Sequence, residues 1–142
     1  MSAPALAQSF TYDVTWQPVE RVGGITVPGG MEYAGGSVKG TYSTTFDDGN
    51  VVKGTVSCVG LDQPAGSLFD VHLSCTATDP QGTYSLAHGC NWMGEPGPQT
   101  PLGCVGAMEG KAGEAKGQRG ALTMHWYSSE KSKGTGQWYT SE

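Results

Sequence analysis

Several features that would assign this sequence to other protein classes are missing from it. Charged residues make up only 15% of the chain, and the net charge of −5 comes without a cluster of lysine or arginine. Nucleic acids need a basic surface, so nucleic acid is not an expected partner. No apolar run approaches the roughly 18 residues that a membrane-spanning helix requires, so no helical membrane span is expected.

Motifs for metals, nucleotides and nucleophilic catalysis are missing as well. None of the four cysteines has the C-x-x-C spacing of zinc or redox sites. The chain contains no G-x-x-x-x-G-K-[ST] phosphate loop, and its serines occupy no nucleophile elbow. We therefore expect no cofactor and no metal site.

The sequence is rich in glycine, at 23 positions, with Val, Thr, Tyr and Trp clustered between the glycines. Residues 10–16 alternate apolar and polar side chains from Phe10 to Trp16, as a half-buried strand does. Similar patterns recur between turn signals at residues 38–46, 51–60, 67–78, 83–92, 104–110, 118–127 and 134–140. The prediction is an all-β fold: one antiparallel meander of eight or nine strands over residues 10–142, after a flexible tail at residues 1–9.

The tail and the cysteines bear on the compartment. Ala5-Leu6-Ala7 resembles the end of a signal peptide, although the charged and apolar regions that precede such an end are absent. An even number of cysteines fits a disulfide-bonded protein. We therefore predict an extracytoplasmic location, periplasmic or secreted. A cytosolic protein with buried free thiols is the alternative.

The positions of the turns predict which residues face each other. Tight turns at residues 47–49, 62–65 and 79–82 would pair Thr44 with Val52, Cys58 with Phe69, and Val71 with Cys90. All three hairpins then place one apolar set on the same face, and a slip of one residue would invert a strand. This face comprises Val38, Tyr42, Phe46, Val52, Val56, Cys58, Phe69, Val71, Leu73, Cys75, Tyr84, Leu86, His88, Cys90 and Trp92.

The same register constrains the disulfides. It separates Cys58 from Cys75 by about 20 Å along the strands, whereas a bridge needs Cα atoms within about 7 Å. A Cys58–Cys75 bridge is therefore not expected, and these two cysteines are left unassigned. A Cys90–Cys104 bridge would close the Pro/Gly loop at residues 94–103, and we predict that pairing.

A meander of this length exposes two sheet edges, and closure into a barrel removes them. Eight strands enclose an interior that side chains fill or that holds one small ligand. The predicted inner face carries rings and small residues rather than a uniform set of Leu and Ile, which predicts a small barrel with an aromatic-lined interior. A solid aromatic core in a β-sandwich is the alternative.

The strand pattern resembles a known group of barrels. Short strands opened by glycine, ending in Gly134-Thr135-Gly136-Gln137-Trp138, are similar over residues 36–140 to the calycin-like barrels of the allene oxide cyclase and dirigent-like proteins. Avidin and lipocalin barrels share much of this pattern. The resemblance implies a cup for a hydrophobic small molecule, sometimes used for cofactor-free cyclisation or isomerisation. No catalytic residue matches by position.

His88 is the candidate catalytic residue because it alternates with apolar residues and so faces inward. Burial would lower its pKa and let it exchange a proton, with Tyr42 and Tyr84 as hydroxyl donors beside it. A core histidine bonded to a backbone carbonyl is the alternative reading. The predicted ligand contacts share a ring or an aliphatic side chain, and they are Tyr12, Phe46, Phe69, Leu73, Leu86, Trp92 and Trp126.

Three functions follow as hypotheses. The barrel could be a cofactor-independent isomerase, cyclase or lyase that acts on a small hydrophobic or aromatic compound. It could instead carry such a compound unchanged. A disulfide-stabilised structural or partner-binding sandwich is the third. The sequence indicates neither the substrate nor the oligomeric state.

Overall fold

The computed structural model describes residues 8–26, 32–97 and 99–139. The predicted tail lies outside these residues except for Gln8 and Ser9, and so does the Ala5-Leu6-Ala7 segment. None of the described residues belongs to a helix capable of spanning a membrane. The described residues form nine strands: β1 (Gln8–Trp16), β2 (Glu20–Thr26), β3 (Glu32–Phe46), β4 (Val51–Asp62), β5 (Val71–Asp79), β6 (Gly82–Trp92), β7 (Leu102–Gly113), β8 (Arg119–Trp126) and β9 (Lys131–Trp138).

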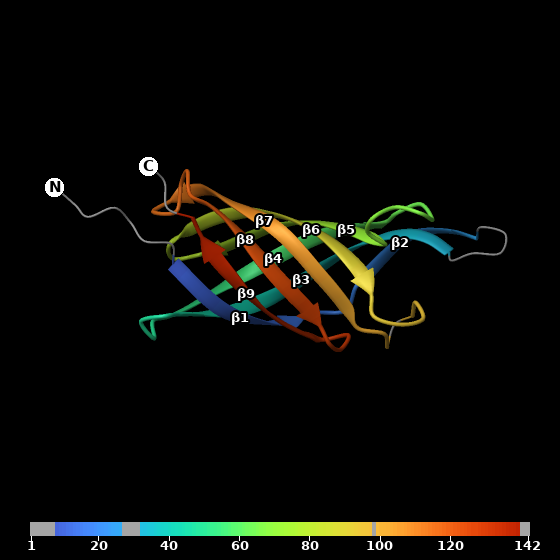
Figure 1. The fold of residues 1–142 in the computed structure, drawn as a ribbon, viewed down its shortest axis with the longest axis horizontal. Coiled ribbons are helices and arrows are strands. Elements are labelled where there is room, and N and C mark those ends of the chain that lie inside the picture. Colours follow the sequence, from blue (N-terminus) through green and yellow to red (C-terminus); the bar gives the residue numbers. More distant parts are fainter. Residues whose placement is uncertain (1–7, 27–31, 98, 140–142) are drawn as a thin grey trace.

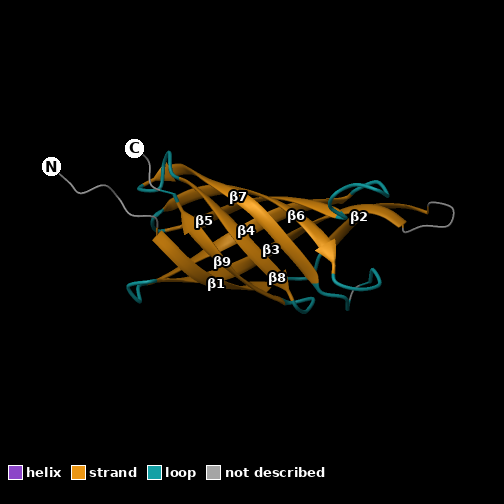
Figure 2. Cartoon of the chain, viewed as in Figure 1, coloured by secondary structure: helices purple, strands orange, loops and turns teal. Residues whose placement is uncertain are grey.

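The strands close into a barrel (Figure 1). From β3 to β9 each strand pairs antiparallel with the next, and β1 pairs with both β9 and β3. Eight strands therefore form the ring, and β2 lies outside it (Figure 2). The predicted all-β antiparallel barrel is confirmed, and the two-sheet sandwich is not the fold.

Strand β2 continues the path of β1 along the same partner. Trp16 at the end of β1 pairs with Gly40 of β3, and Glu20 at the start of β2 pairs with Ser37. The register shifts between Gly23 and Ile25, where Gly23 adopts a φ of 77° that glycine accommodates best. As a result, the β2–β3 ribbon extends past one end of the ring (Figure 1).

The interior follows from the alternation of each strand. In β1, Phe10, Val14 and Trp16 are buried, while Thr11, Asp13 and Thr15 between them are exposed or nearly so. Strand β5 repeats this pattern from Val71 to Ala77. Within each strand, successive side chains therefore lie on opposite sides of the barrel wall. The inner set forms the hydrophobic core.

Two of the three predicted hairpin registers are correct. Thr44 pairs with Val52, and Val71 pairs with Cys90. The β4–β5 register is wrong, because Cys58 pairs with Cys75 rather than with Phe69. The chain turns later than predicted, at Pro64–Ser67, where the Ser67 amide donates to the Pro64 carbonyl and Gly66 adopts a φ of 87°.

Phe69 is therefore not an inner residue, and its predicted role as a ligand contact is wrong. It belongs to the β4–β5 loop, and its ring packs against Gly89. Gly89 pairs with the exposed residues His72 and Val105, so this contact lies on the outer surface. A side chain at Gly89 would collide with the ring, which explains why glycine stands there.

Both disulfides join directly paired residues of neighbouring strands. Cys90–Cys104 links β6 to β7 with a Cα–Cα distance of 4.1 Å, which confirms the predicted bridge. Cys58–Cys75 links β4 to β5 at 4.0 Å, so the expectation that these two are too far apart is wrong. The error follows from the misplaced turn. Two buried disulfides are consistent with an oxidising environment.

Candidate functional site

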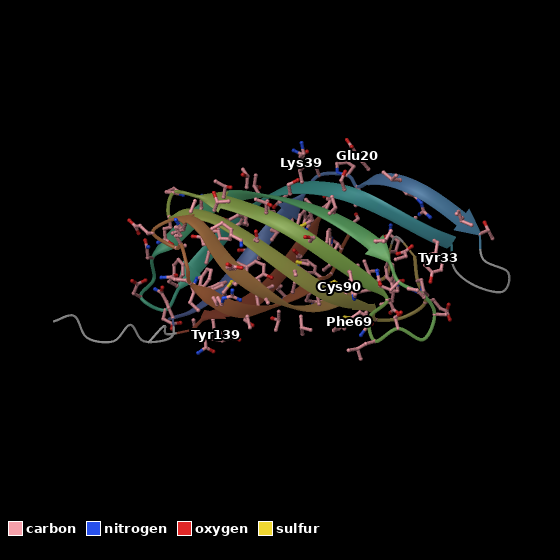
Figure 3. The ribbon with its side chains drawn as sticks, turned by 90° about the horizontal axis from the view of Figure 1, so that it is seen from above. Glu20, Tyr33, Lys39, Phe69, Cys90 and Tyr139 are labelled. Carbon is pink, nitrogen blue, oxygen red and sulfur yellow. A yellow bond between two sulfur atoms is a disulfide. The ribbon has the colours of Figure 1, made fainter. Side chains whose placement is uncertain are left out.

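The barrel contains an internal cavity of about 90 Å³, which we call the lumen cavity. All eight strands of the ring contribute to its walls, and the walls are predominantly apolar. In Figure 3, side chains such as Cys90 lie within the ribbon wall, whereas Glu20 and Lys39 point outward. Three predicted ligand contacts, Tyr12, Phe46 and Leu86, line this cavity.

A second, wider hollow of about 830 Å³, which we call the mouth chamber, lies at the end of the barrel where β6 leaves and β7 enters. Its walls include Trp92, Trp126 and Leu73, the remaining predicted contacts. Trp16 borders both hollows, stacks on Trp126 with ring centroids 4.5 Å apart, and donates from Nε1 to Ser132 Oγ at 2.9 Å. Trp16 thus stands between the two spaces.

Three polar side chains of the lumen cavity gather at the end away from the mouth chamber. The Tyr42 hydroxyl donates to Asp79 Oδ2 at 2.7 Å, and the Tyr84 hydroxyl donates to Oδ1 of the same carboxylate at 3.2 Å. The Gln81 amide also donates to Oδ1, at 2.8 Å. All three side chains of this Tyr42–Asp79–Tyr84 cluster line the cavity.

The cluster depends on local backbone features. Tyr42 reaches Asp79 by crossing Gly54 of the neighbouring strand, where a Cβ would come within 2.6 Å of the tyrosine ring and hydroxyl. Asp79 is the last residue of β5 and pairs with Gly82, so the turn into β6 holds its carboxylate. A small residue at position 54 and a tight turn after Asp79 therefore bring the three groups together.

Burial and the nearby carboxylate both act on the tyrosines. Burial is the main cause that raises the pKa of Tyr42 and of Tyr84, and the Asp79 charge raises both further. Both side chains are therefore neutral hydroxyls at every physiological pH. They are poor proton donors in an acid–base step, but good hydrogen-bond donors to the carboxylate.

His88 faces the lumen cavity, as its alternation with apolar residues predicts. It lies nearer to the mouth chamber than the Tyr42–Asp79–Tyr84 cluster does, because it pairs with Leu73 of the mouth chamber wall. Its side chain is 7% exposed, and Nδ1 lies 4.0 Å from Cys75 Sγ. No described residue forms a closer hydrogen bond with the imidazole. Burial lowers the pKa of His88 to about 4, so the ring is neutral at pH 7. The alternative reading, a histidine bonded to a backbone carbonyl, does not describe this side chain.

The structure does not join His88 to the tyrosines as a direct acid–base pair. Tyr84 and His88 are four residues apart on β6, or roughly 13 Å along the strand. The Tyr84 hydroxyl points to Asp79, which pairs near the opposite end of β6. The imidazole and the phenols therefore act at different depths of one cavity.

Tyr12 has a structural role for its hydroxyl. It lies across Gly134 and donates to the Thr123 carbonyl of β8 at 2.6 Å. Burial raises its pKa, so the hydroxyl stays protonated. Its ring contributes to the cavity wall while its proton is held by the backbone.

Asp79 belongs to the Tyr42–Asp79–Tyr84 cluster, whereas the sequence analysis predicts only a turn at Asp79-Pro80-Gln81-Gly82. A usable signal was present: buried tyrosine hydroxyls need a partner, and a carboxylate at a strand end near two inward tyrosines can supply one. The described residues contain no group of three or more His, Cys, Asp or Glu side chains placed to hold a metal ion. Comparison with protein-family models, curated proteins and solved structures gives no match for this chain.

Proposed function

We propose that this protein binds a small, largely apolar molecule inside its barrel. The observation that supports this is a hollow lumen in which polar groups meet an apolar wall at two depths. Pockets that bind small molecules combine mostly apolar walls with a few placed polar groups. Here the polar groups are the neutral imidazole of His88 and the Tyr42–Asp79–Tyr84 cluster.

The size of the lumen cavity limits the ligand. An apolar cavity of about 150 Å³ can hold benzene, and this one has about 90 Å³. The fit is therefore to about four heavy atoms, or to one end of a longer molecule. The mouth chamber, at about 830 Å³, is large enough to receive the approaching ligand.

A cavity-filling substitution tests this proposal. Ala77 is buried and lines the lumen cavity, so Ala77→Leu should occupy the space that a ligand needs. Native mass spectrometry and organic extraction of the purified protein should recover a bound compound from the wild type. We expect recovery from the filled variant to fall at least tenfold.

Ala87→Leu is the matched control, because Ala87 is exposed on the outer face of the adjacent strand β6. Circular dichroism should show that both variants keep the strand content. Equal recovery from Ala77→Leu and Ala87→Leu would show that the compound does not occupy the lumen, and so would argue against the proposal.

A second candidate function is cofactor-free isomerisation, cyclisation or elimination. A carboxylate and a neutral imidazole face the same cavity, and the resemblance to allene oxide cyclase and dirigent-like barrels suggests such chemistry. A base works best when its pKa lies near the working pH. The pKa of about 4 makes His88 a weak base near neutrality, which favours binding over catalysis.

Incubating the recovered compound with the protein distinguishes the two functions. Conversion by the wild type and by His72→Gln, together with loss of conversion in His88→Gln, would support catalysis. His72 is the control because it is exposed. Recovery of the unchanged compound from all three proteins would support carriage. We also infer a periplasmic or secreted location, which the two disulfides support.

A further inference from the structure

The described lining of the lumen cavity includes a negatively charged side chain but no positively charged one. Among the described residues that line it, Asp79 is the one carboxylate, and no lysine or arginine is present. The imidazole of His88, which also lines the wall, is neutral near pH 7. Asp79 is half-buried, and a partly desolvated carboxylate is stabilised by a nearby opposite charge.

The hydrogen bonds of Asp79 leave room for one more donor. An ionised carboxylate offers about four lone-pair directions, and three are used by Tyr42, Tyr84 and the Gln81 amide. Both tyrosine protons point at the carboxylate, so the phenol oxygens present lone pairs to their other neighbours. The Tyr42–Asp79–Tyr84 cluster therefore presents hydrogen-bond acceptors to this end of the cavity.

Aromatic rings surround the same end. Tyr84 packs against Trp138 with ring centroids 5.6 Å apart, and Phe10 packs edge-on to Phe46 at 5.7 Å. All four rings line the lumen cavity. The faces of aromatic rings attract cations, most strongly where water is excluded.

Two basic side chains of the β7–β8 hairpin pair with Glu109. Lys111 Nζ lies 3.2 Å from Glu109, and Arg119 lies 3.7 Å from the same carboxylate. Asp79 makes no ion pair with any residue that the structure describes. Within the described part of the chain, no ion pair therefore neutralises this carboxylate.

We propose that the Asp79 end of the lumen binds the head of a small organic cation, of the alkylammonium class. This inference rests on the proposed function and names the ligand class of the same cavity. A metal ion would need several oxygen ligands around it, whereas this site offers one carboxylate and aromatic walls. A methylated ammonium group presents apolar methyl groups to the rings and its charge to Asp79, and trimethylammonium has the four heavy atoms that the volume suggests.

A pair of probes of similar shape, one cationic and one neutral, tests this. Trimethylammonium chloride and its neutral analogue tert-butanol are titrated into the wild-type protein up to about millimolar concentrations, the affinity range expected for so few atoms. Binding is followed by the shift of the probe methyl protons in NMR spectra. We expect trimethylammonium to bind at least tenfold more tightly than tert-butanol.

Two variants locate the site. Asp79→Asn removes the charge with little change in shape and should abolish the tenfold preference. Asp13→Asn, at an exposed position on the outer face of β1, should leave it unchanged. If Asp79→Asn does not fold, nuclear Overhauser contacts in the wild type decide instead. Methyl protons next to the rings of Tyr84 and Trp138 support the site, and their absence overturns it.

The remaining outcomes separate this inference from the proposed function. Equal affinity for the two probes in the wild type would overturn the cation preference and leave lumen binding intact. Failure of both probes to bind would overturn the inference. If organic extraction also recovers no compound from the wild type, the proposed function fails with it.

Discussion

His88 shows how a barrel interior changes the chemistry of one residue. A histidine in water has a pKa of 6.5, and burial lowers that of His88 to about 4. The imidazole is therefore held as a neutral, weakly basic group on β6, which is disulfide-bonded to β7 and pairs with β5 of the other disulfide-bonded pair. This state suits a hydrogen-bonding wall residue better than a general base at neutral pH.

The lowered pKa makes a prediction about stability. The folded state holds His88 neutral, while the unfolded chain takes up a proton below pH 6.5, so acid favours unfolding. The stabilisation is complete above pH 6.5 and is lost as the pH falls to about 4. The expected loss from this residue is about 3 kcal/mol of unfolding free energy. Urea unfolding at pH 7 and pH 4 measures it.

Two variants isolate the contribution of His88 from that of other acidic and basic groups. His88→Gln should lose about 3 kcal/mol less than the wild type over this pH range. His72→Gln, which removes an exposed histidine, should behave as the wild type does. An identical pH dependence in His88→Gln and wild type would mean that His88 is not desolvated in the folded state.

At the scale of strands and turns, the alternation of side chains was more predictable than the register. The misplaced turn after β4 moved the predicted pairing partner of Cys58 from Cys75 to Phe69, a change of six residues. Because six is an even number, all side chains of β4 and β5 still lie on the faces predicted for them. Periodicity therefore predicted the inner set correctly except for Phe69, which lies in the loop. The turn at Pro64–Ser67 depends on the conformation of Gly66, which local sequence alone does not distinguish.

The disulfides belong to the same scale, because each ties two neighbouring strands. Their sequence separations are 17 and 14 residues. Closing loops of this size stabilises a protein by about 3 kcal/mol in the chain-entropy model. We expect replacement of both Cys90 and Cys104 by Ala to lower the unfolding free energy by about that amount, as measured by urea titration.

Reduction of the wild-type protein provides the control for this prediction. The intact mass should rise by two hydrogens for each disulfide, and the urea midpoint should fall in parallel. The variant that lacks Cys90 and Cys104 should respond less to reductant, since only Cys58–Cys75 remains in it. A midpoint that reductant does not change, despite the increase in mass, would contradict a stabilising role.

At the scale of the whole molecule, the sequence predicts that the sheet closes into a barrel, but it does not predict which strand lies outside the ring. The sequence predicts a long antiparallel meander with two uncovered edges, and closure into a barrel covers both. The chain segment that stays outside the ring depends on how β1 and β2 share the length of β3, and no local pattern encodes that division. The Tyr42–Asp79–Tyr84 cluster was missed for a similar reason, since Tyr42 reaches Asp79 across an intervening strand.

The different situations of β1 and β2 lead to a prediction about local opening. Strand β1 is paired on both sides and buries three of its side chains, whereas β2 pairs with β3 alone and most of its residues are exposed. Segments with few buried contacts open at a lower free energy than the core. Native-state hydrogen exchange should therefore show β2 amides exchanging through local opening, while β1 amides exchange near the free energy of global unfolding. Equal protection of the two strands would mean that β2 does not open independently of the ring, which would contradict this prediction.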